Sequence, residues 1–344
     1  SKLISLLKFY WDRYWQKENI MLILCGSMAS FMVKRVISSK ALYGRISLQI
    51  LLSPLKPNQA ARFFRRSKEE TLKYFLVFGC IPKYLEEINP NQSFNKNINR
   101  LCFSKESFFY NEVNRIFYSQ FKETRVYLAI VKSLAKANFS AKEISQKIKF
   151  QGNSIKFYLD NLVNAQIISE QIQIDSPHNS RYKKYKLTDE FLVFYFKYIK
   201  PKLPLIKQGS LNKLFEKTCE NEWKPWLGYA FERFCLKNTV YLAEIMGFDD
   251  DLIGVGPYHK GACQIDLMYK KADESYVLCE IKYHDKEITT EIIPELERKI
   301  SLFKLAKGYS LEKALISVHG ANKHLKNSKY FDYIVSLNDI LKLP

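Results

Sequence analysis

Apolar residues follow two different periods in the first fifty residues. Over residues 3–15 they take the i, i+3, i+4 spacing of one broad helical face. The unbroken apolar run 20–25 predicts a buried strand of the kind found inside a parallel sheet, and a second short strand is expected over 46–51. A small polar turn at Gly26-Ser27 leads into a helix that is expected to reach about residue 38. Strand, turn and helix in this order are typical of a nucleotide-binding α/β sheet.

The pattern becomes helical after this and changes again at Thr124. Short amphipathic stretches, interrupted at Gly79-Cys-Ile-Pro82, predict a helical unit over 58–123. Beyond it, Ser140 and Glu143 form a capping box. Helices are expected at 125–136, 140–148 and 153–164, strands at 167–174 and 182–187, and an aromatic helix at 189–199. Three helices followed by a hairpin are the winged helix-turn-helix plan, which we assign to 124–200.

In this plan, 153–164 is the recognition helix for DNA. Its N-terminal polar side chains are the ones nearest to base edges in a major groove. The residues that point away from its apolar face are Asn153, Ser154, Lys156, Phe157 and Asn161. The wing is expected to place Arg181, Lys183 and Lys184 over phosphates. The alternative is a winged helix that packs against other protein, as a lid or docking module.

A linker and a second α/β unit complete the chain. Two prolines and a glycine within 201–209 predict a linker over 201–221. The unit that follows, 222–344, shows a helix at 222–237, strands at 251–256, 262–269 and 275–282, a helix at 289–306, a strand at 313–318 and a strand-helix segment at 331–341. The fold class is therefore α/β plus α.

Acidic residues and one lysine gather on neighbouring elements of this last unit. Asp266 lies late in one strand, and the next strand ends in Glu280-Ile-Lys282, where alternation puts Glu280 and Lys282 on one face. If these strands pair as a hairpin, Asp266 lies near Glu280. Glu232 is an acid among apolar residues in the preceding helix. Clustered carboxylates are the ligands that Mg²⁺ prefers, and an adjacent lysine stabilises charge that builds on a phosphate.

The order Glu…Asp…Glu-x-Lys on an α-β-β-β-α-β core resembles the PD-(D/E)XK nuclease superfamily, over residues 222–341. The resemblance implies that Asp266 and Glu280 are metal ligands, that Lys282 is the catalytic lysine, and that Glu232 completes the metal site. The chain departs from the family pattern at Gln264-Ile265, where a proline would precede the aspartate. The alternatives are a Glu/Lys ladder on an ordinary hairpin and a degenerate nuclease fold that is kept for binding.

Taken whole, the chain resembles the C-terminal two-thirds of an archaeal-type AAA ATPase of the P-loop class that ends in such a nuclease-like domain. The matching segments are Leu22-Ile-Leu-Cys-Gly-Ser27, Leu42-Tyr-Gly-Arg45, Gly79-Cys-Ile-Pro-Lys-Tyr-Leu85, Tyr185-Lys-Leu-Thr-Asp189 and Gly228-Tyr-Ala-Phe-Glu232. The resemblance implies a truncated P-loop ATPase core over 1–57 and a helical lid over 58–123. It places Ser27 at a nucleotide-sensing position and makes Arg45 a phosphate-sensing arginine. Ser27 is also explained as a helix N-cap.

The phosphate-binding machinery of such an ATPase is missing from the sequence. No G-x-x-x-x-G-K-[ST] occurs among the 12 glycines, and no apolar strand ending in paired acids precedes Leu3. Without this loop and without the acid that holds Mg²⁺, the chain as given is not a competent ATPase. ATP is expected as a ligand only if an upstream segment or another chain supplies the Walker motifs.

Composition adds a strong basic balance. The chain has 54 Lys+Arg and 35 Asp+Glu, a net charge of +19. Residues 1–124 contribute +11 (20 minus 9), 125–200 contribute +7 (13 minus 6), and 201–344 contribute only +1 (21 minus 20). DNA is the expected partner, held by the first 200 residues. No apolar run reaches the roughly 18–20 residues of a membrane helix, and seven cysteines without a CxxC pair favour a reducing cytoplasm.

Three functional hypotheses follow. The preferred one is a cytoplasmic, DNA-associated protein with three parts: a truncated ATPase core with a helical lid, a winged helix, and a nuclease-like domain that either cuts DNA with Mg²⁺ or only grips it. The second is a non-enzymatic interaction protein, in which the nuclease fold is a docking domain. The third is an ATP-driven switch, which requires the missing phosphate loop. The missing ATPase half, or another protein, is a further expected partner.

Overall fold

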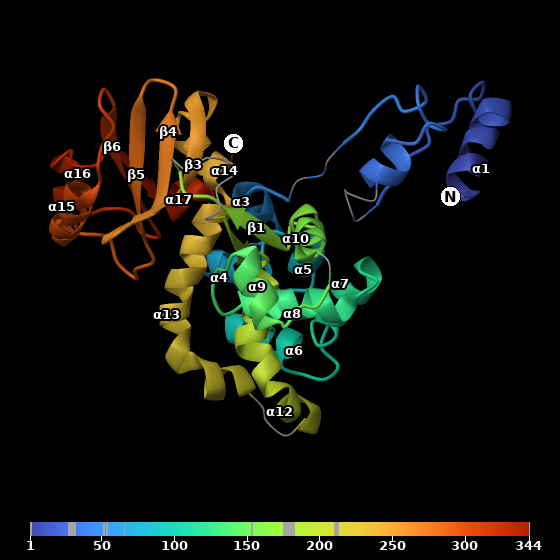
Figure 1. Cartoon of the computed structure of the whole chain (residues 1–344). Coiled ribbons are helices and arrows are strands. Elements are labelled where there is room, and N and C mark those ends of the chain that lie inside the picture. The colour runs from blue at the N-terminus through green and yellow to red at the C-terminus, as the bar shows by residue number, and fades with distance from the viewer. Residues whose placement is uncertain are drawn as a thin grey trace.

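The computed structural model describes residues 2–26, 32–50, 52, 54–64, 66–152, 154–174, 183–209 and 213–343. The N-terminal segment, residues 2–50, is helical where it is regular: α1 (Lys2–Tyr10) continues into a π-helical turn (Trp11–Trp15), and a second π-helical turn spans Met32–Ile37. Figure 1 shows this segment projecting from the body of the molecule. The helix predicted over 3–15 is confirmed.

Both strands predicted in this segment are wrong. Residues 20–26 and 46–50 have no regular secondary structure. Their apolar side chains face solvent, with Met21 84% and Ile23 72% exposed. A strand is held by hydrogen bonds to a neighbouring strand, and the described part of residues 2–50 contains none. An apolar run of six residues does not distinguish a buried strand from an irregular segment whose apolar side chains are exposed.

The helical unit predicted over 58–123 is confirmed. It begins with α3 (Pro57–Ala60) and continues with α4 (Lys68–Phe78), α5 (Pro82–Glu86), α6 (Phe94–Cys102) and α7 (Glu112–Gln120). The side chains of Ser67 and Ser93 cap the N-termini of α4 and α6. Gly79 ends α4 at a φ of +67°, and a Cβ there would lie 2.7 Å from a carboxylate oxygen of Glu190.

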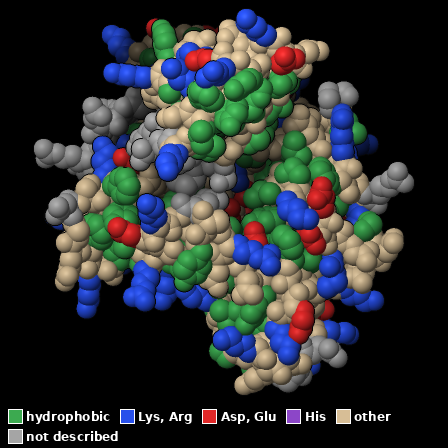
Figure 2. Space-filling model, turned by 90° about the vertical axis from the view of Figure 1, so that its right-hand side faces the viewer, with side chains coloured by type: hydrophobic (Ala, Val, Ile, Leu, Met, Phe, Trp, Pro, Cys, Tyr) green, Lys and Arg blue, Asp and Glu red, His purple; other side chains and the backbone are tan. Residues whose placement is uncertain are grey.

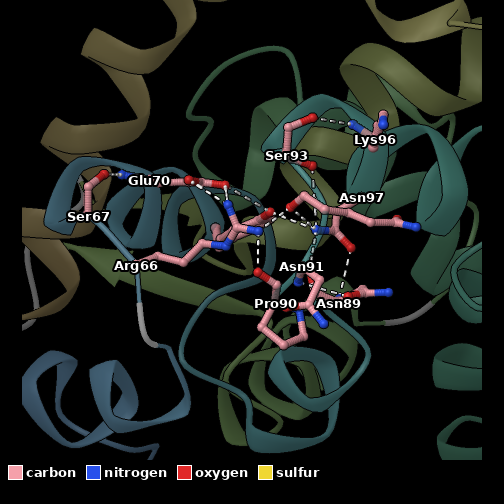
Figure 3. Close-up of polar contacts among 11 residues, drawn as sticks. Arg66, Ser67, Glu70, Asn89, Pro90, Asn91, Ser93, Lys96 and Asn97 are labelled. Carbon is pink, nitrogen blue, oxygen red and sulfur yellow. Dashed lines mark hydrogen bonds and ion pairs between the residues drawn. The ribbon is translucent and has the colours of Figure 1, made fainter.

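A polar network holds the loop between α5 and α6 (Figure 3). The buried Asn97 donates from Nδ2 to the carbonyls of Asn89 and Gln92 and to the Tyr74 hydroxyl, at 2.9–3.0 Å. Its Oδ1 accepts from the backbone N–H of Asn89 at 2.9 Å. Arg66 binds Glu70 and also donates to the Gln92 carbonyl. Because these partners satisfy the buried amide, the network fixes the loop and explains a polar residue in an apolar core.

Three helices and two antiparallel strands, the elements expected for a winged helix, lie within residues 124–187, and we call them the winged-helix unit. It consists of α8 (Thr124–Leu134), α9 (Ala141–Lys147), α10 (Ile155–Asn164) and the antiparallel strands β1 (Ile168–Gln171) and β2 (Lys184–Leu187). The capping box of Ser140 and Glu143 is confirmed. The aromatic helix follows as α11 (Glu190–Phe194) and a π-helical turn. The segment predicted as a linker is instead largely helical in its described part. A 3₁₀ turn directly follows the π-helical turn, and α12 (Leu203–Gln208) follows the 3₁₀ turn.

The C-terminal unit is a mixed α/β structure. Its helices are α13 (Leu214–Lys237), α14 (Thr239–Met246), α15 (Ile293–Leu302), α16 (Lys323–Asn327) and α17 (Leu337–Ile340). Its strands are β3 (Leu252–Lys260), β4 (Cys263–Lys271), β5 (Ser275–Lys282), β6 (Ser310–Ser317) and β7 (Tyr333–Ser336), in the order β3-β4-β5-β6-β7. The first two pairings are antiparallel and the last two are parallel. The element order predicted from the sequence is confirmed.

Helices cover both faces of this sheet (Figure 1). One face, with Leu267, Cys279 and Ile316, shares a continuous apolar core with α13, α14, α17 and the helical unit. The other face, with Met268 and Leu278, packs on α15 and α16. The broad first core joins the C-terminal unit to the helical and winged-helix units.

The chain that follows β1 docks against β3 by its backbone. The Ile174 N–H donates to the Pro257 carbonyl at 3.2 Å, and the Ile174 side chain enters the core between the sheet and α15. At Gly256 the backbones come so close that an added Cβ would lie 2.8 Å from the Ile172 carbonyl oxygen. Glycine is therefore required by close approach, and the winged-helix and C-terminal units meet without room for movement at this point.

We expect Gly256→Ala to lower the free energy of unfolding by about 1–3 kcal/mol, because the methyl group meets rigid backbone. The matched control is Gly254→Ala, two residues away in β3, where the nearest atoms lie at 3.6 and 3.9 Å. Its effect should stay within about 0.5 kcal/mol. Urea unfolding followed by circular dichroism measures both. Equal losses in the two variants would contradict the docking of the wing on β3.

Candidate functional site

Asp266 lies at a β-bulge opposite a proline. Gly256 pairs with Met268 and Tyr258 pairs with Ile265, so β4 has one residue more than β3 between these pairs. Pro257 has no N–H to offer to the ladder, and prolines inside sheets occur at bulges for this reason. Bulges redirect the side chain that they carry. The bulge therefore gives Asp266 an orientation that strand alternation does not predict.

Glu280 is a buried carboxylate held by two lysines. Only 2% of its side chain is exposed. Lys299, from α15, binds both of its oxygens at 2.7 and 3.0 Å, and Lys282 lies 2.9 Å from Oε1. Glu295 lies 3.5–3.6 Å from both ammonium groups. The lysines offset the cost of burying the Glu280 charge, so β5 and α15 form one ionic cluster.

Asp266 experiences excess negative charge. Burial, together with the nearby Glu232 and Glu280 carboxylates, raises the pKa of Asp266 to about 6, although Lys299 and Lys282 act in the opposite direction. The hairpin register, with Leu267 opposite Cys279, brings Asp266 toward Glu280 as predicted. Four residues named from the sequence, Glu232, Asp266, Glu280 and Lys282, thus share one electrostatic neighbourhood, which is typical of functional sites.

Three residues of this neighbourhood were missed by sequence reasoning. They are Lys186 in β2, His259 in β3 and Lys299 in α15. Burial lowers the pKa of Lys186, while Glu232 and Asp266 partly restore it. Burial also lowers the pKa of His259. Glu232 acts to raise this pKa, and Lys184 and Lys186 act to lower it. The winged-helix unit therefore contributes charge to a site on the C-terminal unit, which spacing along the chain could not reveal.

A cavity opens where the wing meets the β3–β4 hairpin. We call it the junction cavity. Its volume is about 630 Å³. It is lined by Gln171, Gln173, Lys184, Pro257, His259 and Gln264, with Ser140 and Glu143 of the capping box at its side. Gln264 is two residues before Asp266, and His259 pairs with Gln264 across the two strands. The cavity is therefore bordered by both units, and one of its lining residues stands two positions before Asp266 on β4.

The acidic residues fit a divalent cation by chemical type but not by arrangement. Mg²⁺ prefers carboxylate oxygens, which Asp266, Glu280 and Glu232 supply. Within the described ranges, however, no three His, Cys, Asp or Glu side chains are placed to hold one metal ion. Both oxygens of Glu280 are instead occupied by lysine ammonium groups. The site is an ion-paired cluster in which lysines compensate the carboxylates.

The predicted DNA-contacting residues divide into four kinds. Asn153 and Arg181 lie outside the described residues. Ser154, Lys156 and Phe157 are exposed at the start of α10, as predicted. Asn161 donates to the Tyr127 hydroxyl at 2.8 Å, so its amide is engaged inside the unit. Lys183 pairs with Glu170 at 2.6 Å, whereas Lys184 lines the junction cavity.

Of the two predicted nucleotide-sensing residues, Arg45 lies within the described residues and Ser27 does not. Ser27 lies outside the described residues. Arg45 donates to both Asp12 oxygens at 2.6 and 2.8 Å and is thereby held within the N-terminal segment. This ion pair raises the pKa of Arg45 and lowers that of Asp12. Arg45 serves here to join two parts of that segment.

The N-terminal segment also exposes many apolar side chains. Leu3, Leu6, Met21, Ile23 and Leu48 are each more than half exposed. Figure 2 shows hydrophobic side chains gathered at the top of the molecule, where the N-terminal segment lies, and lysine and arginine side chains spread over the rest of that face. Contiguous apolar surface of this kind marks an interaction site. No helix in the described ranges is long and apolar enough to cross a membrane.

We expect Asp266→Asn to stabilise the folded protein at pH 7.5 by about 1–2 kcal/mol and to lose this gain near pH 4. The folded pKa, about 6, is above the usual value of 3.8, so the carboxylate costs stability as pH rises through this window. Asp273, at the turn of the same hairpin, has a pKa lowered by its hydrogen bond from Ser275. Asp273→Asn should therefore destabilise at pH 7.5. Urea unfolding at both pH values measures this, and the same sign in both variants would contradict it.

Comparison with known proteins gives two similarities. Residues 195–293 match the model of the family DUF234, described as "Archaea bacterial proteins of unknown function". This range includes Glu232, Asp266, Glu280 and Lys282. The chain is also 28% identical over 310 residues to the uncharacterized protein MJECL04 of Methanocaldococcus jannaschii, which covers 88% of this chain and 69% of that protein. The chain is thus similar to an archaeal protein over most of its length, and the acidic site lies within its DUF234-like part.

Proposed function

We propose that this chain binds DNA and that its C-terminal unit carries a nuclease-like site for the phosphodiester backbone. The observation that carries the proposal is the shared electrostatic neighbourhood of Glu232, Asp266, Glu280 and Lys282. These residues come from α13, β4 and β5 of an α-β-β-β-α-β order. Their resemblance to the PD-(D/E)XK pattern supports the same reading.

The winged-helix unit supplies the DNA contacts in this proposal. Ser154, Lys156 and Phe157 are exposed at the N-terminal end of α10, the end that reads base edges in helix-turn-helix proteins. Residues 125–200 carry a balance of +7 (13 minus 6), which favours a polyanion. Since the wing docks on β3, DNA on α10 is held at a fixed relation to the acidic site.

The chemistry assigned to the site follows from its charges. Glu280 and Glu295 keep Lys282 protonated by raising its pKa against the effect of burial, so its ammonium stabilises negative charge on a phosphate. With a pKa of about 6, Asp266 is ionised at neutral pH and is basic enough to accept a proton from an attacking water. If Mg²⁺ were bound instead, Asp266, Glu280 and Glu232 would be the residues to hold it once Lys282 and Lys299 had released Glu280, and it would supply further charge stabilisation.

A second candidate is DNA binding without cleavage. The occupation of both Glu280 oxygens by Lys299 and Lys282 favours it, because the cluster is then stable without a cation. The nuclease-like fold would serve as a rigid partner for the winged helix. An ATP-driven switch stays a prediction, because it requires a phosphate-binding loop that the sequence does not contain. A protein partner is supported by the exposed apolar side chains of residues 2–50.

We expect the wild-type chain to nick supercoiled plasmid in Mg²⁺ or Mn²⁺. Asp266→Asn and Glu280→Gln should each lower the nicking rate by roughly 100-fold or more, since an essential carboxylate is lost. Both variants should keep wild-type affinity for a DNA duplex, measured by fluorescence anisotropy, because α10 is unchanged. The matched control is Glu291→Gln, an exposed acid of the same unit, which should nick at the wild-type rate.

Three outcomes decide between the candidates. If the wild type and the three variants all bind the duplex and none of them nicks the plasmid, the binding-only candidate is correct and cleavage is excluded. Nicking that persists in Asp266→Asn and Glu280→Gln would show that these carboxylates are not the site. Absence of both duplex binding and nicking would remove the proposal altogether.

A further inference from the structure

The junction cavity has the size and chemistry of a binding site that the proposed function does not use. Its volume, about 630 Å³, lies within the roughly 300–1,000 Å³ of small-ligand sites. It is bordered on one side by β1, β2 and the chain after β1, and on the other by β3 and β4. Because Ile174 and Pro257 are joined by a backbone hydrogen bond, its two walls are fixed relative to each other.

Carboxamides form much of the lining. Gln171, Gln173 and Gln264 come from both walls of the junction cavity. The Gln171 Oε1 accepts from Asn138 Nδ2 at 2.9 Å, which orients this amide and leaves its NH₂ group as a donor. Glutamine side chains present a donor beside an acceptor, the pattern that matches the edge of a nucleobase.

Basic side chains lie beside these amides. Lys184 lines the cavity and is exposed, and His259 lies opposite it on β3. Lys186 is two residues along β2, so in a strand it extends from the same face as Lys184. Among the described residues of the lining, Glu143 is the one acid, and its carboxylate accepts from the backbone N–H and hydroxyl of Ser140 at 2.7 and 2.8 Å. An ammonium group next to neutral amides is suited to a phosphate with a base attached.

We propose that the junction cavity binds a nucleotide, with Lys184 on its phosphate and the carboxamides of Gln171, Gln173 and Gln264 on its base. The nucleotide comes either from solution or from an unpaired position in a DNA strand held by the winged-helix unit. Only the second source rests on the proposed function. In that case the cavity places one nucleotide beside Asp266, two residues beyond Gln264 on β4.

The test is calorimetric titration of the full chain, in EDTA, with deoxyadenosine monophosphate, with inorganic phosphate and with a short single-stranded oligonucleotide of mixed sequence. Lys184→Gln should weaken binding of the nucleotide or the oligonucleotide roughly tenfold, because a charge-assisted contact is lost. Gln264→Ala, at an exposed position, should weaken it by about three- to tenfold without lowering stability. The matched control is Lys326→Gln, which removes the same charge from an exposed residue of α16 outside the described cavity lining and should bind as the wild type.

The outcomes separate the two sources and the alternatives. Loss of monophosphate binding in Lys184→Gln and Gln264→Ala identifies a free nucleotide, and loss confined to the oligonucleotide identifies an unpaired strand position. Binding of phosphate as tight as that of the nucleotide would overturn a base-reading cavity. Equal weakening by Lys326→Gln and Lys184→Gln would also overturn it, as would no binding of any of the three probes. Because EDTA removes metal, failure of the nicking assay leaves this result unaffected.

Discussion

The close backbone approach between the wing and β3 is the constraint on which the candidate site depends. Gly256 has no Cβ, and so the Ile172 carbonyl can approach it; Pro257 has no N–H, and so the neighbouring strand forms a bulge. One short segment of β3 therefore both receives the wing and places Asp266. If this segment were an ordinary strand, Lys184 and Lys186 would have no fixed relation to the acids of the C-terminal unit, and the junction cavity would have only one wall.

Charge compensation explains how such an acidic site survives inside a folded protein. Glu280 is neutralised by lysines from β5 and α15, whereas Asp266 is not fully compensated and has a raised pKa. An incompletely compensated carboxylate costs folding stability at neutral pH, and proteins retain such costs where function needs them. The same imbalance attracts a cation or a proton. This imbalance is the electrostatic reason to assign cation or proton binding to Asp266. Lys299 is assigned the role of neutralising Glu280.

The fold of the last 220 residues could be predicted in outline because its signals are local. The Ser140–Glu143 capping box, the alternating strand of Glu280 and Lys282, and the hairpin that brings Asp266 toward Glu280 all follow from spacing. The bulge, the reach of Lys299 to Glu280 and the contribution of Lys186 could not be predicted, because they depend on tertiary packing. The apolar run 20–25 predicted a strand wrongly for the same reason, since hydrophobicity shows a need for burial but not the partner that provides it.

The central claim is that the winged helix and the C-terminal sheet act as one unit around the junction cavity. Hydrogen–deuterium exchange of the full chain, with and without a DNA duplex that carries an unpaired stretch, tests this most directly. Slower exchange is expected in α10 and also in residues 171–174 and in β3, with the same dependence on DNA concentration. Slower exchange in α10 alone, with β3 and residues 171–174 unchanged at saturating DNA, would contradict it.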